Sequence, residues 1–329
     1  MSTVPFSASP APALEAAEPM RFGFSGRGAT VMGLHLQNVF WTVLTAGLYY
    51  SWGKARLQGY FYSQIEVAGD RLAYMGTGRE FFLGWLRAAG VVVAVLVLQN
   101  VIDWNDKSEW QLWGLGFFYL AALLLTPLAT VGMMRFRLAR TDWRGIRFSF
   151  RGTVREYAPI FFREALFLTL TFGLYYPHFN ANTRRYLVAN TYLGDRAFAY
   201  DGRGADLMGI YIKALARSLP TFGLFWSWMQ AEQETYDWSH TTLGEARFSS
   251  TVTGEGLMWL WVTNMALIVI TLGLAWPWAR LRSLRYRLAN LSLVGPIEPD
   301  GLRQDERLGT ATGEQLGEAM GTFDGGFGF

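Results

Sequence analysis

Six long apolar stretches dominate the chain, and short segments in which polar and apolar residues alternate separate them. Three of these stretches contain no charged residue and a fourth contains one, Arg87, near its start. About 20 apolar residues cross the ~30 Å hydrocarbon core of a bilayer as a helix, so this pattern predicts six membrane helices. The stretches are Gly28–Trp52, Phe81–Ile102, Leu112–Met134, Tyr157–Tyr176, Leu207–Met229 and Gly256–Trp278.

The chain is built from an internal repeat. A string of the form Phe-x-Phe-x-Gly-x-Gly, or a variant of it, starts at residues 22, 72, 148, 198 and 248, so the spacings are 50, 76, 50 and 50 residues. Thr-x-Gly-Leu follows four of the five starts, and a cluster of Trp and Tyr comes next. Apolar residues flank the pairs Gly69-Asp70 and Gly194-Asp195, a pattern that predicts β-hairpins. The strands are expected around 60–67 and 72–76, and around 188–193 and 197–201.

These elements predict an all-α polytopic membrane protein with small β-hairpins. About six membrane helices would be arranged in repeated helix-plus-hairpin units. Residues 1–20 are rich in Ala, Pro and Ser and lack a basic start, so we expect a disordered leader rather than a signal peptide. Residues 21–295 would form the repeat-built membrane domain. Residues 296–329 are rich in Gly and acidic residues and predict a flexible tail.

The amino-acid composition is typical of a protein that is partly surrounded by lipid. Hydrophobic residues make up 51% of the chain and charged residues only 17%, against about 25% charged in a soluble domain. The chain has no Cys and three His, which excludes disulfides, thiolate catalysis and Cys-ligated zinc. Arginines cluster within 135–155 and 280–287, directly after predicted spans. They indicate cytoplasmic anchoring and contact with anionic lipid headgroups, and not a nucleic-acid groove.

One motif carries a family resemblance. Thr45-Ala-Gly-Leu-Tyr-Tyr-Ser-Trp-Gly-Lys-Ala-Arg56 resembles the signature of the YjgN-like bacterial inner-membrane proteins, and residues 271–280 are similar to a second copy. The resemblance covers about residues 21–295 and implies a multi-pass protein of the bacterial inner membrane. It supplies no catalytic or cofactor-binding residues. We expect its repeated residues to form an interfacial motif: Thr45, Gly47, Trp52, Lys54, Arg56, Thr171, Gly173, Thr271, Gly273, Trp276, Pro277 and Arg280.

A polar layer recurs inside the predicted helices. Polar or cationic residues occupy the fifteenth position after each motif start, and the next position is polar in three units. One hypothesis is a ring that lines a pore or cavity suited to an anion or an acidic headgroup. The alternative is that long side chains reach the nearby interface and that amides and ion pairs join helices. The candidate residues are Gln37, Asn38, Arg87, Arg163, Glu164, Lys213 and Asn264.

The functional prediction is an integral inner-membrane protein without an enzymatic site, a cofactor or a bound metal. Transport or a channel-like role for a small solute, ion or lipid is the first hypothesis, because repeats often build such sites. The alternative is a non-catalytic membrane scaffold or assembly factor. Membrane lipids are the expected partners, together with a second copy or a protein held through the acidic tail. The acidic segment 230–255 either faces the periplasm or pairs with arginines of a neighbouring unit.

Overall fold

The computed structural model describes residues 19–103, 110–218, 221 and 225–295, with side chains at only some positions between 87 and 118. The expected acidic tail and nearly all of the expected leader therefore lie outside the described residues. In the described chain the order strand, helix, helix, strand occurs five times. Each of these five units begins with the strand that carries the Phe-x-Phe-x-Gly string or its variant.

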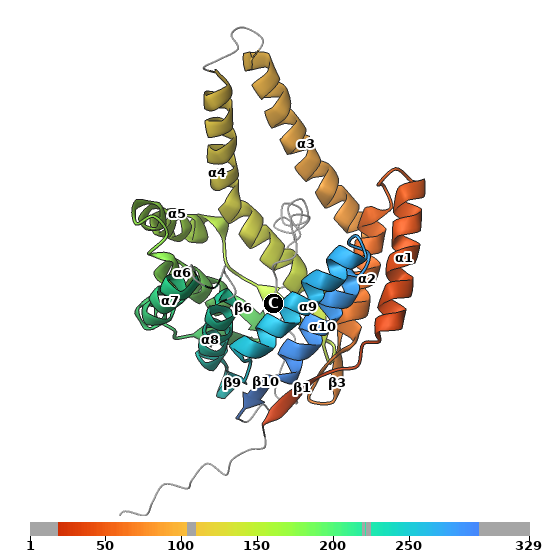
Figure 1. Ribbon diagram of the computed structural model, residues 1–329, viewed down its shortest axis with the longest axis vertical. Helices are drawn as coiled ribbons and strands as arrows, with labels where there is room; N and C mark the ends of the chain where they lie inside the picture. Colours follow the sequence, from red (N-terminus) through yellow and green to blue (C-terminus); the bar gives the residue numbers. More distant parts are fainter. Residues whose placement is uncertain (1–18, 104–109, 219–220, 222–224, 296–329) are drawn as a thin grey trace, which may run out of the picture.

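Each unit has two successive helices, and the second leads the chain back to the sheet (Figure 1). The first helices are α1 (Gly28–Leu44), α3 (Gly78–Asp103), α5 (Val154–Leu170), α7 (Gly204–Ser218) and α9 (Gly254–Ile270). The second helices are α2 (Tyr50–Ser63), α4 (Trp110–Ala139), α6 (Tyr176–Ala189), α8 (Trp226–Ser239) and α10 (Trp276–Ala289).

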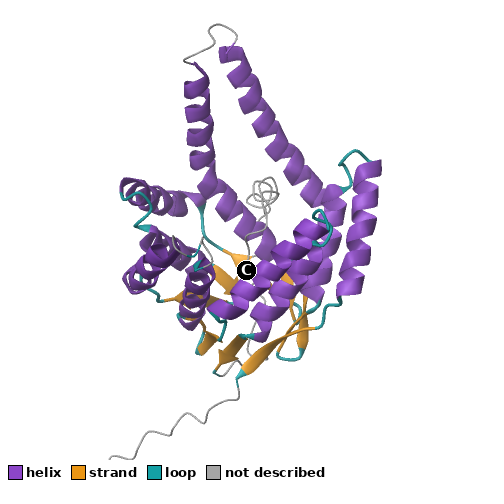
Figure 2. Ribbon diagram, viewed as in Figure 1, coloured by secondary structure: helices purple, strands orange, loops and turns teal. Residues whose placement is uncertain are grey.

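Ten short antiparallel strands close into a barrel at one end of the molecule (Figure 2). The order around the barrel follows the chain, and β1 pairs with β10 to close the ring. The strands are β1 (Met20–Phe24), β2 (Ile65–Val67), β3 (Asp70–Tyr74), β4 (Thr141–Trp143), β5 (Ile146–Phe150), β6 (Thr191–Leu193), β7 (Arg196–Tyr200), β8 (Thr241–Leu243), β9 (Ala246–Ser250) and β10 (Leu291–Val294).

The barrel interior is a packed core. The first residue of each repeated string faces inward, and the phenyl rings of Phe22, Phe148, Phe198 and Phe248 stack with centroid separations of 6.2–6.4 Å. Leu72 occupies the fifth place and packs against the same cluster. Small barrels are filled by side chains in this way, because alternate residues of every strand point inward. The aromatic-x-aromatic spacing of the repeat is therefore the spacing of one strand face.

The glycines of the repeated string permit close contacts. A Cβ on Gly26 would lie 2.6 Å from the ring of Phe24, and Gly152 stands in the same relation to Phe150 at 2.7 Å. The aromatic ring two residues earlier folds back over the glycine as the strand turns into the helix. Only a glycine leaves room for it, since real Cβ atoms essentially never approach within 3.0 Å of another heavy atom.

The predicted fold class is wrong. The structure is a closed antiparallel barrel surrounded by helical hairpins, and not a bundle of six membrane helices. Four of the expected spans each divide into two helices of one hairpin at Thr-x-Gly-Leu. The turn residues are apolar, so hydropathy runs through them without a break. The other two, 81–102 and 112–134, lie in α3 and α4. Among the described residues one segment, Tyr119–Ala139, is long and apolar enough to cross a membrane.

The two expected β-hairpins are present. β2 pairs with β3 across Ala68-Gly69, and β6 pairs with β7 across Gly194-Asp195. Both residues of the first turn have positive φ, 53° and 83°, as a two-residue hairpin turn that matches the twist of its strands requires. The strands before the turns are shorter than expected, because residues 60–63 still belong to α2. The hairpins also pair with one another, and only their closure into one barrel was not predicted.

Candidate functional site

The turn between the two helices of a hairpin has the same structure in three units. In the first, Ala46 and Gly47 adopt φ of 51° and 95°, which reverses the chain direction. The Thr45 hydroxyl donates to the carbonyl of Trp41 at 2.7 Å and accepts the amide of Tyr49 at 3.0 Å. Gly is needed because its left-handed conformation costs it little. Thr-x-Gly-Leu, expected to be an interfacial motif, is thus the tip of a helical hairpin.

Every backbone N–H in these tips has a partner within the tip. From Thr45 to Tyr50, each amide donates to a carbonyl or to the threonine hydroxyl at 2.7–3.2 Å. The tips at 171–176 and 271–276 repeat the same bonds, including the one to the hydroxyl of Thr171 or Thr271. A loop in water does not need to pair all of its backbone N–H groups internally, because water satisfies exposed amides. A loop in hydrocarbon does need this internal pairing, since an unpaired polar group there costs several kcal/mol.

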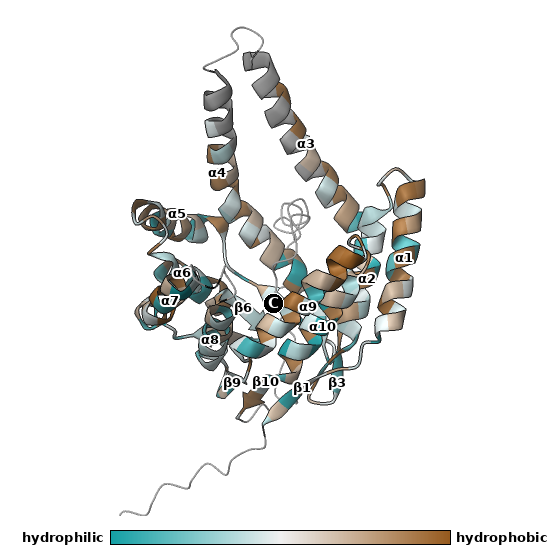
Figure 3. Cartoon of the chain, viewed as in Figure 1, coloured by the Kyte–Doolittle hydropathy of each residue, from teal (hydrophilic) through white to brown (hydrophobic). Residues whose placement is uncertain are grey.

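Large apolar side chains project from the tips. Phe172 and Leu272, at the position between Thr and Gly, are 97% and 93% exposed. Apolar residues of the flanking helical turns, such as Val43, Leu170 and Ile270, are also exposed. Figure 3 shows strongly hydrophobic residues where α1 and α9 approach their tips. Contiguous exposed apolar surface of this kind marks a contact with a membrane or a protein.

The buried members of the predicted polar layer join the two helices of one hairpin. The Asn38 amide donates to the Gly53 carbonyl at 3.0 Å, and the Asn264 amide donates to the Ala279 carbonyl at 3.3 Å. Glu164 is 1% exposed and accepts from Asn182 at 2.9 Å and from Arg163 at 2.7 Å. The hydrogen-bond partners of each of these side chains therefore lie in the same hairpin as the side chain itself.

The other members of the layer lie on the outside of the hairpins. Gln37 and Lys213 are exposed, and the side chain of Arg163 is 61% exposed. The side chain of Arg87 lies outside the described residues. The exposed polar groups precede the apolar tips by about two and a half helical turns. The structure places the layer at one level of several hairpins and does not bring its exposed members into contact with one another.

Contacts between successive units close the ring of hairpins, and the sequence analysis missed them. A Cβ on Gly28 of α1 would lie well under 3.0 Å from the indole of Trp278 in α10. The start of α3 meets Trp52, that of α7 meets His178 and that of α9 meets Trp228 in the same way. Trp52 thus helps to join units, although it was expected to be only interfacial. A Trp or His recurs near the start of the second helix in these units, ahead of the Gly at the start of the next first helix. This recurrence was the signal that the sequence contained.

A second recurring contact lies within four of the five units. The hydroxyl of Tyr60 accepts the amide of Arg27 at 2.8 Å, just before α1 begins. Tyr186, Tyr236 and Tyr286 do the same for residues 153, 203 and 253, always 33 positions earlier. These bonds satisfy one of the amides that a helix N-terminus leaves without an intrahelical partner. The tyrosines recur at the motif spacing, so the sequence contained this signal too.

The acidic fourth unit pairs with its neighbours. Glu234 in α8 lies 3.5 Å from Arg287 in α10, and Asp237 in α8 lies 3.4 Å from Arg184 in α6. The Tyr200 hydroxyl also donates to Asp237 at 2.7 Å. Burial raises the pKa of Glu234 above its usual value, while the two arginines oppose this effect. Of the two alternatives for this segment, the contacts correspond to pairing with arginines of adjacent units.

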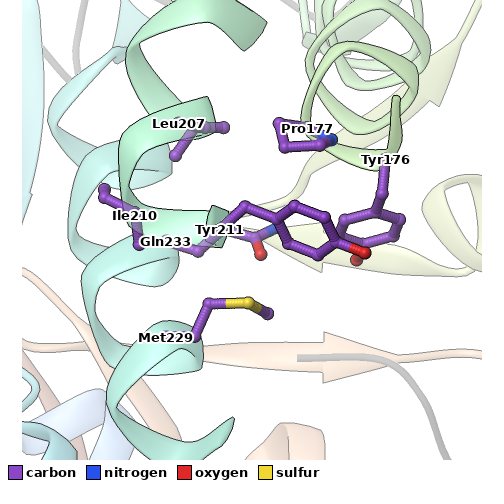
Figure 4. Close-up of a pocket in the computed structure, with 7 residues that line it drawn as sticks. All are labelled: Tyr176, Pro177, Leu207, Ile210, Tyr211, Met229 and Gln233. Atoms are coloured by element: carbon purple, nitrogen blue, oxygen red, sulfur yellow. The ribbon is translucent and has the colours of Figure 1, made fainter. Parts of the chain in front are cut away.

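Two hollows lie between neighbouring hairpins. The first, about 10 Å³ and so about the size of one water, lies where α6 meets α7 and α8. Tyr176 and Tyr211 face each other beside it (Figure 4), with ring centroids 5.6 Å apart. The second, about 240 Å³, lies between the first hairpin tip and α3. Among the described residues no group of three His, Cys, Asp or Glu residues is placed to hold a metal ion.

Comparison with known proteins assigns the family. Residues 19–223 and 215–319 match the family described as "Bacterial protein of unknown function (DUF898)". The chain belongs to this family. It is also similar to proteins named Inner membrane protein YjgN: 26% identical over 152 residues in Escherichia coli K12, and 24% identical over 154 residues in Salmonella typhimurium LT2. The resemblance to YjgN-like proteins is thereby confirmed.

These matches cover part of each protein. They include 46% and 45% of this chain and 36% and 37% of the two relatives. The YjgN protein of Escherichia coli O157:H7 is 28% identical over 134 residues, which are 41% of this chain and 32% of that protein. The chain therefore spans about a third of the length of the curated relatives it matches. No solved structure matches the chain.

Proposed function

We propose that this DUF898 protein is a non-catalytic scaffold of the bacterial inner membrane. Its short helical hairpins enter one leaflet from the cytoplasmic side, and its barrel lies at the membrane surface as a platform for other proteins. The tips carry this proposal, because they combine backbone N–H groups that are all paired within the tip with exposed apolar side chains. Relatives named inner membrane proteins support the location.

The depth of insertion follows from helix geometry. Arg163 and Phe172 are nine residues apart on one hairpin, which corresponds to about 13 Å along a helix that rises 1.5 Å per residue. Half of the ~30 Å hydrocarbon core is about 15 Å. With the tip near the bilayer midplane, the exposed cations Arg163 and Lys213 lie at the headgroups. There they favour anionic phospholipids, at about 1 kcal/mol per cation near the surface.

The second unit differs in length. α3 has 26 residues and α4 has 30, so they extend for about 39 and 45 Å and rise above the other hairpins in Figure 1. These lengths exceed the ~30 Å hydrocarbon core. In the proposal this hairpin crosses the membrane and makes the protein multi-pass, while the four shorter hairpins return within one leaflet. All strands then lie on the cytoplasmic side, where the arginines that follow α4 and those within α10 satisfy the positive-inside rule.

Scaffolding is favoured over transport by two sets of contacts. Asn38, Glu164 and Asn264 bond within their own hairpins, so they are used as links between helices. The stacked phenylalanines fill the middle of the barrel, where a conduit along its axis would have to run. A ring closed by the same contact at successive units is suited to holding partners at fixed positions.

The test uses the absence of Cys from the chain. Single cysteines at Leu272 (L272C, a tip) and at Ala197 (A197C, the outer face of the barrel) are exposed to an impermeant maleimide in right-side-out and inside-out vesicles. We expect no labelling of L272C from either side and labelling of A197C from the cytoplasmic side only. Labelling of L272C from either side would contradict the insertion of the tip into hydrocarbon. Reconstituted vesicles should show no ion flux above protein-free vesicles, and a flux would favour transport.

A further inference from the structure

We propose that the hollow between the first hairpin and α3 binds one acyl chain of a phospholipid. This proposal rests on the proposed insertion of the hairpins into the membrane. The α1–α3 groove, as we call this hollow, has a volume of about 240 Å³, on the measure by which one water needs about 10–15 Å³. It is lined by Thr42, Gly47, Leu48, Tyr50, Ser51, Phe82 and Trp85.

The position of the groove supports a lipid tail. Its tip end consists of Gly47 and Leu48, which belong to the turn that the proposed function places in hydrocarbon. Aromatic rings follow one another from the tip to α3. The centroid separations are 6.2 Å for Trp41–Tyr49, 6.5 Å for Tyr49–Trp52, 5.4 Å for Trp52–Phe82 and 6.2 Å for Phe82–Trp85. Of these rings, Phe82 and Trp85 line the groove and present a rigid apolar wall, since each has few rotatable bonds, and the other rings pack in line with them.

Cationic residues lie at the other end. The Lys54 ammonium is 5.4 Å from the ring centroid of Phe81, next to Phe82 of the groove. Arg56 on α2 and Arg79 at the start of α3 are exposed. A ligand in the groove would thus have an apolar part toward the tip and a negative charge toward these cations. That is the order of a phospholipid in the leaflet that the hairpins enter.

The equivalent place between the third and fourth units is closed. Tyr176 and Pro177 correspond to Tyr50 and Ser51, and Tyr211 corresponds to Trp85, thirteen residues after its motif start. The Tyr211 hydroxyl donates to the carbonyl of Gly173 in the neighbouring tip at 3.1 Å. Only about 10 Å³ is left there, beside the paired tyrosines of Figure 4. The chain therefore fills this interface with its own side chain in one place and leaves it open in another.

This difference provides a variant that should close the groove. Thr42→Leu introduces the residue found at the corresponding Leu168, and Trp85→Tyr introduces the counterpart of Tyr211, which can reach the carbonyl of Gly47. Trp261 occupies the same position in the fifth unit and is exposed. Trp261→Tyr is therefore the matched control, with the same change of side chain at a place without the α1–α3 groove.

The experiment measures retained lipid. Each protein is reconstituted into phosphatidylethanolamine–phosphatidylglycerol vesicles, extracted again in mild detergent, washed and examined by native mass spectrometry. We expect one retained phospholipid on the wild type and on Trp261→Tyr, and at least a tenfold lower occupancy on the double variant. A phosphatidylglycerol with a diazirine at its chain end should label the peptide that contains Trp85 in the wild type.

Three results would overturn the proposal. They are equal retention by the double variant, a detergent molecule in place of the phospholipid, and labelling spread evenly over all hairpins. If the tips are buried in hydrocarbon and the protein retains no lipid, the proposal of a lipid in the groove fails and the proposed scaffold function stands. If the tips are accessible to water, the proposed function fails first. Should the double variant not fold, labelling of the wild-type peptide still decides the question.

Discussion

Gly28→Ala should open the ring of hairpins at the place where the first and last units meet. Gly28 is the first residue of α1, and a Cβ there would lie well under 3.0 Å from the Trp278 indole. Either the indole leaves its place or α1 shifts away from α10. Because β1 and β10 also meet between these units, a shift of α1 strains the closure of the barrel.

The magnitude follows from two terms. Overpacking a filled contact costs about 1–3 kcal/mol. Displacing Trp278 also weakens its contact with Arg282, whose guanidinium is 5.3 Å from the ring centroid, and a partly exposed pair of this kind contributes about 0.5–1 kcal/mol. Gly33→Ala in the same helix is the control, because its Cβ would meet nothing within 4 Å. It should stabilise the helix by about 0.5–1 kcal/mol.

Two assays compare the variants. Denaturant unfolding in detergent micelles should place Gly28→Ala about 2–5 kcal/mol below Gly33→Ala, from the terms above. A cysteine pair at Arg21 and Ser292, which are partners in the β1–β10 ladder, reports closure directly. Its disulfide should form more slowly in Gly28→Ala. Equal stability of the two variants, with equal rates of disulfide formation, would refute the claim that Gly28 is needed to close the ring of hairpins.

The remaining predictions concern buried carboxylates. Glu164→Leu leaves the amide of Asn182 without its acceptor and should destabilise the protein by about 1–3 kcal/mol, whereas Glu164→Asn should cost less because two other hairpins use Asn there. Thermal unfolding of both variants checks this, and equal losses would contradict it. The pKa of Glu234 is raised, so the folded state takes up a proton before the unfolded state does. Stability should therefore increase as pH falls through that pKa, and Glu234→Gln should flatten this dependence in melting curves recorded from pH 8 to 5.

Local structure could be predicted where one residue type has one conformational role. The motif starts at 22, 72, 148, 198 and 248 all fall inside the first strand of a unit, because alternate aromatic residues and a following Gly specify a strand that turns into a helix. The hairpin expected at Gly69-Asp70 is present with its turn one residue earlier, at Ala68-Gly69, because a glycine between two β-prone stretches favours a tight turn. The described residues of the predicted polar layer lie at one level of several hairpins, and the sequence left their role open.

The tips and the barrel could not be predicted from hydropathy. Residues 45–49 are as apolar as the helices beside them, so the only break in the pattern was Thr45 with Gly47, and both are tolerated inside membrane helices. The barrel depends on pairing of Met20 with Leu293, at opposite ends of the described chain. Contacts such as Gly28 with Trp278 join residues from different units, and a single sequence does not show which partner each has.

The depth of a hairpin tip in the bilayer tests the central claim most directly. Single cysteines at Phe172 (F172C) and Arg163 (R163C) are labelled with a fluorophore, and lipids with quenchers at known depths report where each one lies. The account predicts strongest quenching of F172C by quenchers near the bilayer midplane, and of R163C by quenchers at the headgroups. The two depths should differ by about 13 Å for a helix normal to the membrane, and by less for a tilted one. Quenching of F172C by aqueous iodide, or equal depths for both sites, would contradict the account.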